Sequence, residues 1–194
     1  MGGQELALAD PGTQDASPTG MQGEDRKYLT FIQGDARYGI SIAWVREIIE
    51  YGVVTRVPMT PGHVRGVINL RGSVVPIVDL GRRLGLEGTR AGKRCCNIIV
   101  EVPEDDGVIP VGIAVDAVDE VLAIQATAVE PPPPFGTDVP ADLLYGIGRV
   151  DGRFVSLLDL EKTLALEQLA RWVGAATDFP NGKDAAEAAS APGA

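Results

Sequence analysis

The chain comprises 194 residues, of which 45% are hydrophobic, and its formal net charge is −10. This length suits one domain or two small ones. No apolar run approaches the roughly 20 residues that a membrane-spanning helix needs, and the N-terminal residues lack the apolar core of a signal peptide, so neither membrane insertion nor a secretory leader is expected.

Residues 1–25 contain five acidic side chains and no basic one, without hydrophobic periodicity, which predicts a disordered acidic tail. Alternating and β-branched residues then predict strands at 28–33 and 38–42. In the segment AWVREII at 43–49, apolar residues have helical spacing, so one or two helical turns are expected there. A further short strand is expected at 53–57.

Residues 64–80, VRGVINLRGSVVPIVDL, contain two β-branched runs separated by Arg71 and Gly72. This pattern predicts a β-hairpin with Arg71, its one long charged side chain, at the tip. Asp79 precedes LGRRL, so it should cap a short helix that ends near Leu86.

The second half of the chain predicts strands at 96–102, 108–115 and 120–124, followed by a second hairpin from 144–150 and 153–158. Apolar residues at 160, 164, 166, 169 and 173 have helical spacing and predict one sizeable C-terminal helix over 160–173. Residues 174–194 are expected to form a second loose tail.

Two blocks of sequence occur twice in the same order. At an offset of 80 residues Gly66 matches Gly146 and Asp79 matches Asp159, and at an offset of 73 YGISIAWVREII matches VGIAVDAVDEVL. Such a repeat predicts two copies of one supersecondary unit, at about 26–86 and 94–160 within an ordered domain at 26–173. Many short strands then predict a mainly β fold of two small β-barrels. Because a copy of roughly 70 residues has no ample core, the copies should share a third hydrophobic interface.

Charge is unevenly distributed along the chain. Residues 26–94 contain twelve basic and five acidic side chains, whereas residues 95–173 contain four basic and fourteen acidic ones. Either both halves are ordinary solvated surfaces, or the domain is dipolar and suited to head-to-tail contact with partners of similar shape.

The sequence segments that could indicate catalysis or cofactor binding do not meet the requirements of the known motifs. The segment GIGRVDG places its third glycine one position too late for a dinucleotide-binding motif, and AGKR lacks the Ser or Thr of a phosphate-binding loop. His63 has no nearby Ser or Cys nucleophile in sequence. Cys95 and Cys96 are adjacent and belong to no Cys/His cluster. The sequence therefore predicts a protein that is not an enzyme and holds neither a metal nor another cofactor.

Nucleic-acid binding is disfavoured, because only 5% of residues are aromatic and the chain is acidic. Protein–protein interaction is the favoured class, and two positions are candidates. Arg71 at one predicted hairpin tip becomes Asp151 at the other, unless both are merely solvated turns. The stiff prolines at 131–134 would present Phe135 at little entropic cost, unless Phe135 packs into its own barrel. Val45 and Glu47, on a predicted short exposed turn, carry a weaker signal.

These motifs resemble those of the CheW family of chemotaxis coupling proteins. The segments that carry the resemblance span about 26–169 and are YGISIAWVREII, VTRVPMTPGHVRGVINLRGSVVPIVDLGRRLGL, VGIAVDAVDEVL, EPPPPFG and GIGRVDGRFVSLLDLEKTL. The resemblance implies two intertwined five-stranded, SH3-like β-barrels. It also implies a non-catalytic adaptor that couples transmembrane chemoreceptors to the histidine kinase CheA, at the cytoplasmic face of the membrane. A scaffold of a non-flagellar pathway such as pilus motility is the alternative.

By the same resemblance, Arg71 of the NLRG motif would lie on the receptor-contact surface with Val45 and Glu47 of the WVREI motif. Phe135 of the PPPPF loop would lie on a kinase contact. The regulatory domain of the kinase has the same double-barrel fold in this family, and the two kinds of domain alternate in rings. Glu130 stands where a basic residue can occur, which leaves the charge pairing at the kinase contact open.

Overall fold

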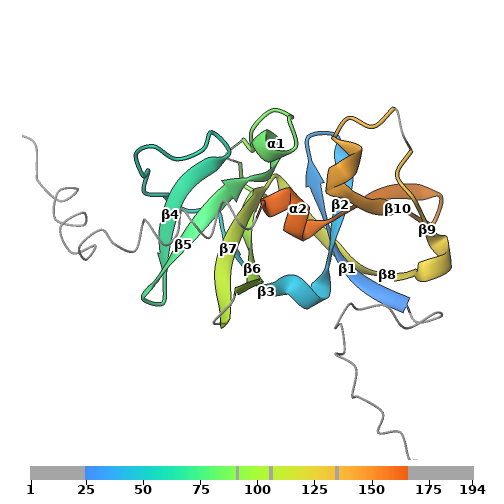
Figure 1. Cartoon of the computed structure of the whole chain (residues 1–194), viewed down its shortest axis with the longest axis horizontal. Helices are drawn as coiled ribbons and strands as arrows, with labels where there is room; N and C mark the ends of the chain where they lie inside the picture. Colours follow the sequence, from blue (N-terminus) through green and yellow to red (C-terminus); the bar gives the residue numbers. More distant parts are fainter. Residues whose placement is uncertain (1–24, 91, 105–106, 134–135, 166–194) are drawn as a thin grey trace, which may run out of the picture.

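The computed structural model describes residues 25–90, 92–104, 107–133 and 136–165, and the two tails expected at the chain ends lie almost wholly outside this part. Two twisted β-sheets lie side by side (Figure 1). The strands are β1 (Asp25–Gln33), β2 (Ala36–Ser41), β3 (Val45–Glu50), β4 (Val64–Leu70), β5 (Ser73–Asp79), β6 (Cys96–Glu104), β7 (Gly107–Val115), β8 (Ala117–Gln125), β9 (Val129–Glu130), β10 (Leu144–Val150) and β11 (Arg153–Leu158). The helices are α1 (Leu80–Arg83) and α2 (Leu160–Leu164), with 3-10 turns η1 (Ile42–Trp44), η2 (Ala126–Ala128) and η3 (Ala141–Leu143).

The first sheet has the strand order β8-β1-β2-β11-β10-β9. Its two outer strands are consecutive in the chain and are separated only by η2, so β8 pairs with β1 while β9 pairs with β10. The sheet thereby closes on itself into what we call the first barrel. The expected five strands are counted as six because η2 interrupts the closing strand.

The second sheet has the strand order β3-β6-β7-β5-β4 and forms the second barrel. It closes just after β3, where the backbone N–H and C=O of Thr55 bond with Val67 of β4 at 2.9 and 2.8 Å. The strand expected at 53–57 is wrong, because only this one bridge forms. Exposed Gly52 and Pro58 flank it, and proline cannot donate to a ladder.

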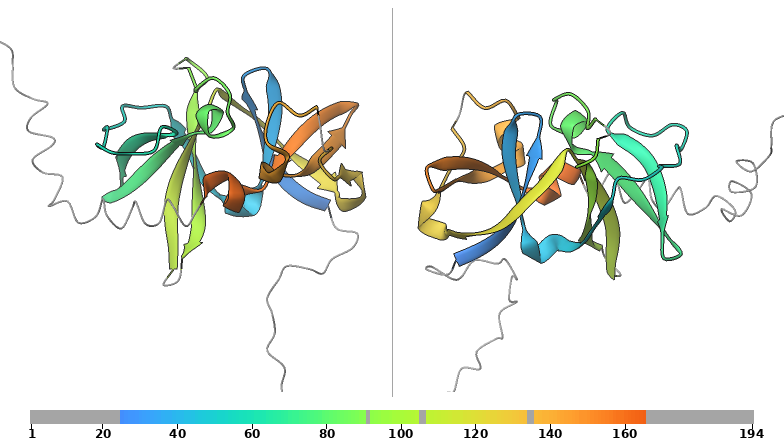
Figure 2. Two further views of the ribbon diagram at one scale, coloured as in Figure 1. Left: turned by 45° about the horizontal axis from the view of Figure 1, so that its top comes forward. Right: turned by 180° about the vertical axis from the view of Figure 1, so that it is seen from behind.

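Each barrel takes strands from both copies of the repeat, as Figure 2 shows from two sides. β1 and β2 join the second-copy strands β8–β11, whereas β6 and β7 join the first-copy strands β3–β5. The joints are two parallel pairings at equivalent positions, with Gly39 opposite Leu157 and Gly112 opposite Ile77. The barrels are therefore intertwined, and the basic and acidic halves of the chain do not correspond to them.

The largest buried cluster is shared by the two sheets, as predicted. Phe31 and Tyr38 of the first sheet stack with ring centroids 6.2 Å apart, and they belong to one cluster with Val100 and Ile113 of the second sheet. Leu160 of α2, which lies between the sheets in Figure 1, joins the same cluster. Burying an aliphatic side chain of this size contributes about 1.5–3 kcal/mol, so this shared layer stabilises both barrels together.

The predicted hairpins and the predicted Asp79 cap are confirmed, and Asp159 is a cap of the same kind. β4–β5 and β10–β11 are antiparallel hairpins, and the Asp79 and Asp159 carboxylates accept backbone N–H groups in the first turns of α1 and α2. The C-terminal helix predicted over 160–173 begins at Leu160, but α2 ends at Leu164, where Ala165 follows with a φ of +48°. Residues 166–173 lie outside the described residues. Within the described part, no helix has the length and apolar character needed to cross a membrane.

Candidate partner-binding surface

The tip of the β4–β5 hairpin is a two-residue turn that holds Arg71 outward. Arg71 and Gly72 have φ values of +53° and +91°, as a tight hairpin turn requires. The Asn69 side-chain oxygen accepts the Gly72 N–H at 2.9 Å, which fixes the turn further. The Arg71 side chain remains 69% exposed, so its guanidinium lies at the surface on a defined backbone.

The Arg71 guanidinium binds Glu47 through both of its terminal nitrogens. Nη1 donates to Oε1 at 2.7 Å and Nη2 donates to Oε2 at 3.0 Å. Glu47 lies on β3 and Arg71 at the end of β4, so the pair joins the two outer strands of the second sheet where the barrel closes. An exposed pair of this kind contributes about 0.2–1 kcal/mol, and its main effect is to orient the two side chains.

Two further charged side chains extend this pair across the barrel. Arg46 lies 3.9 Å from Glu47 and donates to Glu101 of β6 at 3.1 Å. The Glu47 side chain, only 21% exposed, lies between two arginines, and the adjacent Ile48 is 46% exposed. We call Arg46, Glu47, Ile48 and Arg71 the tip surface. It combines an oriented charge network with an exposed aliphatic side chain, a composition suited to binding a protein partner.

The structure places Val45 differently from the sequence prediction. Val45 and Glu47 lie on strand β3 rather than on a helical or exposed turn, because the β-branched segment pairs with β6. Val45 lies opposite Val100, and a register shift separates it from Glu47. The Val45 side chain packs against the shared cluster, so it supports β3 from below while Glu47 faces the surface network.

The equivalent tip of the second copy has the same turn and the opposite charge. Asp151 and Gly152 have φ values of +50° and +75°. Glu120, which matches Glu47 in the repeat, is bound instead by Arg37 of β2 at 3.3 Å. The tip residue of the second hairpin therefore takes no part in a pair like Arg71–Glu47, and Arg37 neutralises the acid from another strand.

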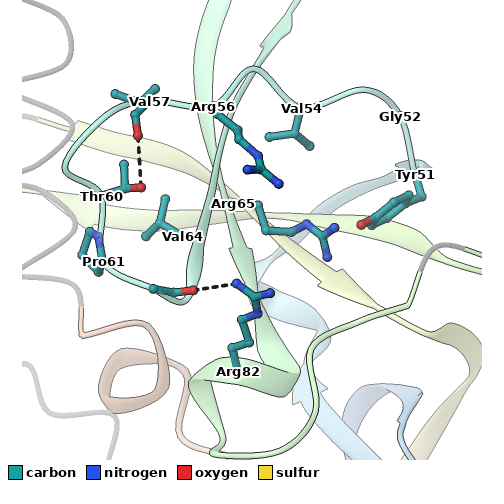
Figure 3. Close-up of a pocket in the computed structure, with 11 residues that line it drawn as sticks. Tyr51, Gly52, Val54, Arg56, Val57, Thr60, Pro61, Val64, Arg65 and Arg82 are labelled. Atoms are coloured by element: carbon teal, nitrogen blue, oxygen red, sulfur yellow. Dashed lines mark hydrogen bonds between the residues drawn. The ribbon is translucent and has the colours of Figure 1, made fainter.

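The candidate kinase-contact residue Phe135 and its neighbour at 134 lie outside the described residues. Among the residues that are described, no group of three or more His, Cys, Asp and Glu side chains could hold a metal ion. The charged site that sequence reasoning missed is a cavity lined by three arginines (Figure 3). Its arginines come from a loop, a strand and a helix, and no short motif signals their convergence.

Comparisons with known proteins agree with this architecture. A family model described as a CheW-like domain matches residues 27–168. The chemotaxis protein CheW of Klebsiella aerogenes is 37% identical over 145 residues, covering 75% of this chain and 85% of the relative. The probable chemotaxis protein CheW of Rhizobium etli is 35% identical over 137 residues, covering 71% and 86%. The crystal structure of scaffolding protein TtCheW from Thermoanaerobacter tengcongensis superposes with a TM-score of 0.64 at 31% identity, covering 77% of this chain and 91% of that one.

Proposed function

This chain belongs to the CheW family of chemotaxis coupling proteins, and on that premise we propose that it joins the cytoplasmic tip of a chemoreceptor to the regulatory domain of the histidine kinase CheA. The protein is a non-catalytic scaffold of chemotaxis signalling. In this proposal the protein acts at the cytoplasmic face of the membrane, where receptor arrays recruit it.

The tip surface is the proposed receptor contact. The observation that carries this assignment is the two-point pairing of Arg71 with Glu47, which fixes the orientation of the exposed Arg71 guanidinium at the edge of the second barrel. Preorganised charges of this kind lower the entropic cost of binding and select a partner of complementary charge. Val45 contributes by packing beneath β3 rather than by direct contact.

The proline-rich segment that ends in Phe135 is the proposed kinase contact. Its support is the sequence itself, because consecutive prolines hold an extended conformation before a partner arrives. Binding one partner at the tip surface and another at this segment would make the second encounter effectively intramolecular. Rings in which this domain alternates with similar double-barrel domains fit the same scheme, since such contacts are head-to-tail.

Replacing Arg71 by aspartate should weaken receptor binding by about tenfold or more, because a charge-assisted contact is lost and its sign reversed. The fold should tolerate this change, since Asp151 already occupies the equivalent position at a φ of +50°. The measurement is co-sedimentation of the full chain with a receptor cytoplasmic fragment and with a kinase fragment, separately and together. Asp151→Ala at the matching tip is the control and should leave receptor binding unchanged.

A charge exchange separates direct contact from a structural role. In Glu47→Arg/Arg71→Glu the ion pair is restored with its direction reversed. If the receptor reads these side chains directly, the double variant still binds weakly. Recovery of full binding would mean that the pair only stabilises the barrel, and the receptor-contact assignment would be wrong. Failure of the wild-type chain to sediment with either fragment would contradict the proposed function itself.

A further inference from the structure

A polar cavity of about 570 Å³ lies beside the loop between β3 and β4, at the end of β4 away from Arg71 (Figure 3). Arg65 and Arg71 are six residue steps apart, so the cavity lies about 20 Å along the strand from the tip surface. Its volume lies within the roughly 300–1,000 Å³ that small-molecule sites occupy. The cavity is thus distinct from the proposed partner contact.

Three arginines from three elements line this cavity: Arg56 from the loop, Arg65 from β4 and Arg82 from α1. Within residues 25–165 as far as they are described, the one acid that pairs with them is buried Asp79, which Arg65 binds at 3.0 Å and Arg82 approaches to 3.9 Å. Arg56 makes no hydrogen bond or ion pair among the described residues. Three permanent positive charges therefore face one negative charge, which leaves an excess that an anion would neutralise.

The Tyr51 hydroxyl supplies a second, independent indication of a ligand. It is a buried side-chain oxygen that has no hydrogen-bond partner in the described part of the chain, and Tyr51 also lines the cavity. Figure 3 shows the Tyr51 ring beside Arg65, whose guanidinium carbon lies 5.0 Å from the ring centroid. Burial raises the pKa of Tyr51, so the hydroxyl stays protonated and can donate to an acceptor. Buried polar groups are normally paired, and this one has an unused donor.

The wall of the cavity is held in place before any ligand binds. The Thr60 hydroxyl donates to the Val57 carbonyl at 3.2 Å, and Arg82 donates to the Gly62 carbonyl at 3.2 Å. The Thr55 bridge to β4 fixes the other end of the loop. A positively charged site with fixed walls would lose little entropy on binding an anion.

We propose that this cavity binds a phosphate-bearing small molecule, with Arg56, Arg65 and Tyr51 as donors to the phosphate oxygens. A phosphate dianion matches the excess charge, and guanidinium groups pair with phosphate oxygens through two parallel hydrogen bonds. The cavity exceeds a single phosphate in size, which leaves room for the rest of the ligand. The second copy has Tyr145 and Lys162 where the first has Arg65 and Arg82, so the site belongs to the second barrel alone.

The test is calorimetric titration of the full chain with inorganic phosphate and with pyrophosphate at constant ionic strength, with sodium chloride as the reference anion. Saturable binding is expected, at least threefold tighter for pyrophosphate because it carries more charge. Arg56→Gln should weaken it at least fivefold. Tyr51→Phe should weaken it severalfold without lowering the melting temperature, because the hydroxyl bonds to no other described residue. The control Arg153→Gln, at an exposed arginine of β11, should change nothing.

Heat signals that match those of chloride, or equal losses in Arg56→Gln and Arg153→Gln, would overturn the proposal. Both variants are titrated as folded full-length chains, and the melting temperature of each is recorded. Because neither receptor nor kinase is present in this titration, its outcome is independent of the proposed scaffold function.

Discussion

Gly66 and Gly146 occupy the same place in the two copies, directly after a register shift in the hairpin and against the segment that closes the barrel. A Cβ added at Gly66 would lie 2.1 Å from the Thr55 carbonyl oxygen, and one at Gly146 would lie 2.8 Å from that of Glu130. No side chain fits at either position without movement. Where the chain must close a barrel, the two copies therefore keep the same residue.

The two copies differ at other residues, including the helix caps and the hairpin tips. Asp79 is a buried cap with a side chain 2% exposed, held by Arg65 and by the Thr89 N–H, whereas the Asp159 side chain is 24% exposed and pairs with Lys162. The hairpin tips carry opposite charges, as described above. The exchange of strands between the barrels therefore constrains the residues at which each barrel closes and those at which the two copies pair. Residues that face solvent are not constrained in this way and form different surfaces on the two barrels.

Substitution of the closing glycines should have the largest effect and should differ between the copies. Gly66→Ala should cost about 3 kcal/mol or more of unfolding free energy, because φ is +139° and the obstructing atoms are backbone. Gly146→Ala should cost roughly half as much. Its nearest neighbour is a Val129 methyl group that can move, the backbone oxygen of Glu130 is farther away than that of Thr55 from Gly66, and no positive φ is involved. Urea unfolding of both variants measures the difference.

Equal losses of stability at the two glycines would show that the asymmetry in backbone conformation has no energetic consequence. A Gly66→Ala chain that fails to express in folded form would support the same ordering, provided that Gly146→Ala folds.

Removal of the two aspartate caps should give the next largest contrast. Asp79→Ala should destabilise by about 2–3 kcal/mol, because Arg65 is left without its partner and the Thr89 and Arg82 N–H groups without an acceptor. Asp159→Ala should cost about 1 kcal/mol, the usual value for an exposed helix cap. Thermal unfolding measures both. A larger loss at Asp159 would contradict the view that Asp79 has the additional structural role.

Much of this fold follows from local sequence signals. The β-branched runs with two-residue turns predicted both hairpins, the second at its observed bounds of 144–150 and 153–158, and Asp79 before leucine predicted the cap of α1. The segment at 43–49 was mispredicted because pairing with β6 outweighs its helical spacing. The parallel crossings at Gly39 and Gly112, the contact between Arg71 and Glu47, and the arginine cavity all depend on residues far apart in the chain, for which no local pattern exists.

The smallest expected effect concerns His63, which the second copy replaces with Leu143. The backbone carbonyls of these two residues accept equivalent bonds, from the Asp79 N–H at 2.7 Å and the Asp159 N–H at 2.9 Å. Burial, reinforced by the Arg83 guanidinium, lowers the pKa of His63 below its usual 6.5. Between that lowered pKa and 6.5 the unfolded chain binds more protons than the folded one, so the unfolding free energy contributed by this site falls as the pH decreases through this window.

His63→Leu, which installs the residue of the second copy, should remove this pH dependence, and His63→Gln should remove it too while keeping a polar side chain. The measurement is the difference in urea midpoint between wild type and each variant from about pH 8 to about pH 5, where histidine changes charge. Taking the difference cancels the contribution to the pH dependence from carboxylates, which titrate in all three proteins. The expected curves diverge toward acidic pH, with the wild type losing more stability than either variant. Parallel curves would show that the imidazole is protonated as easily in the folded chain as in the unfolded one. His63 and Leu143 would then differ only in side-chain shape.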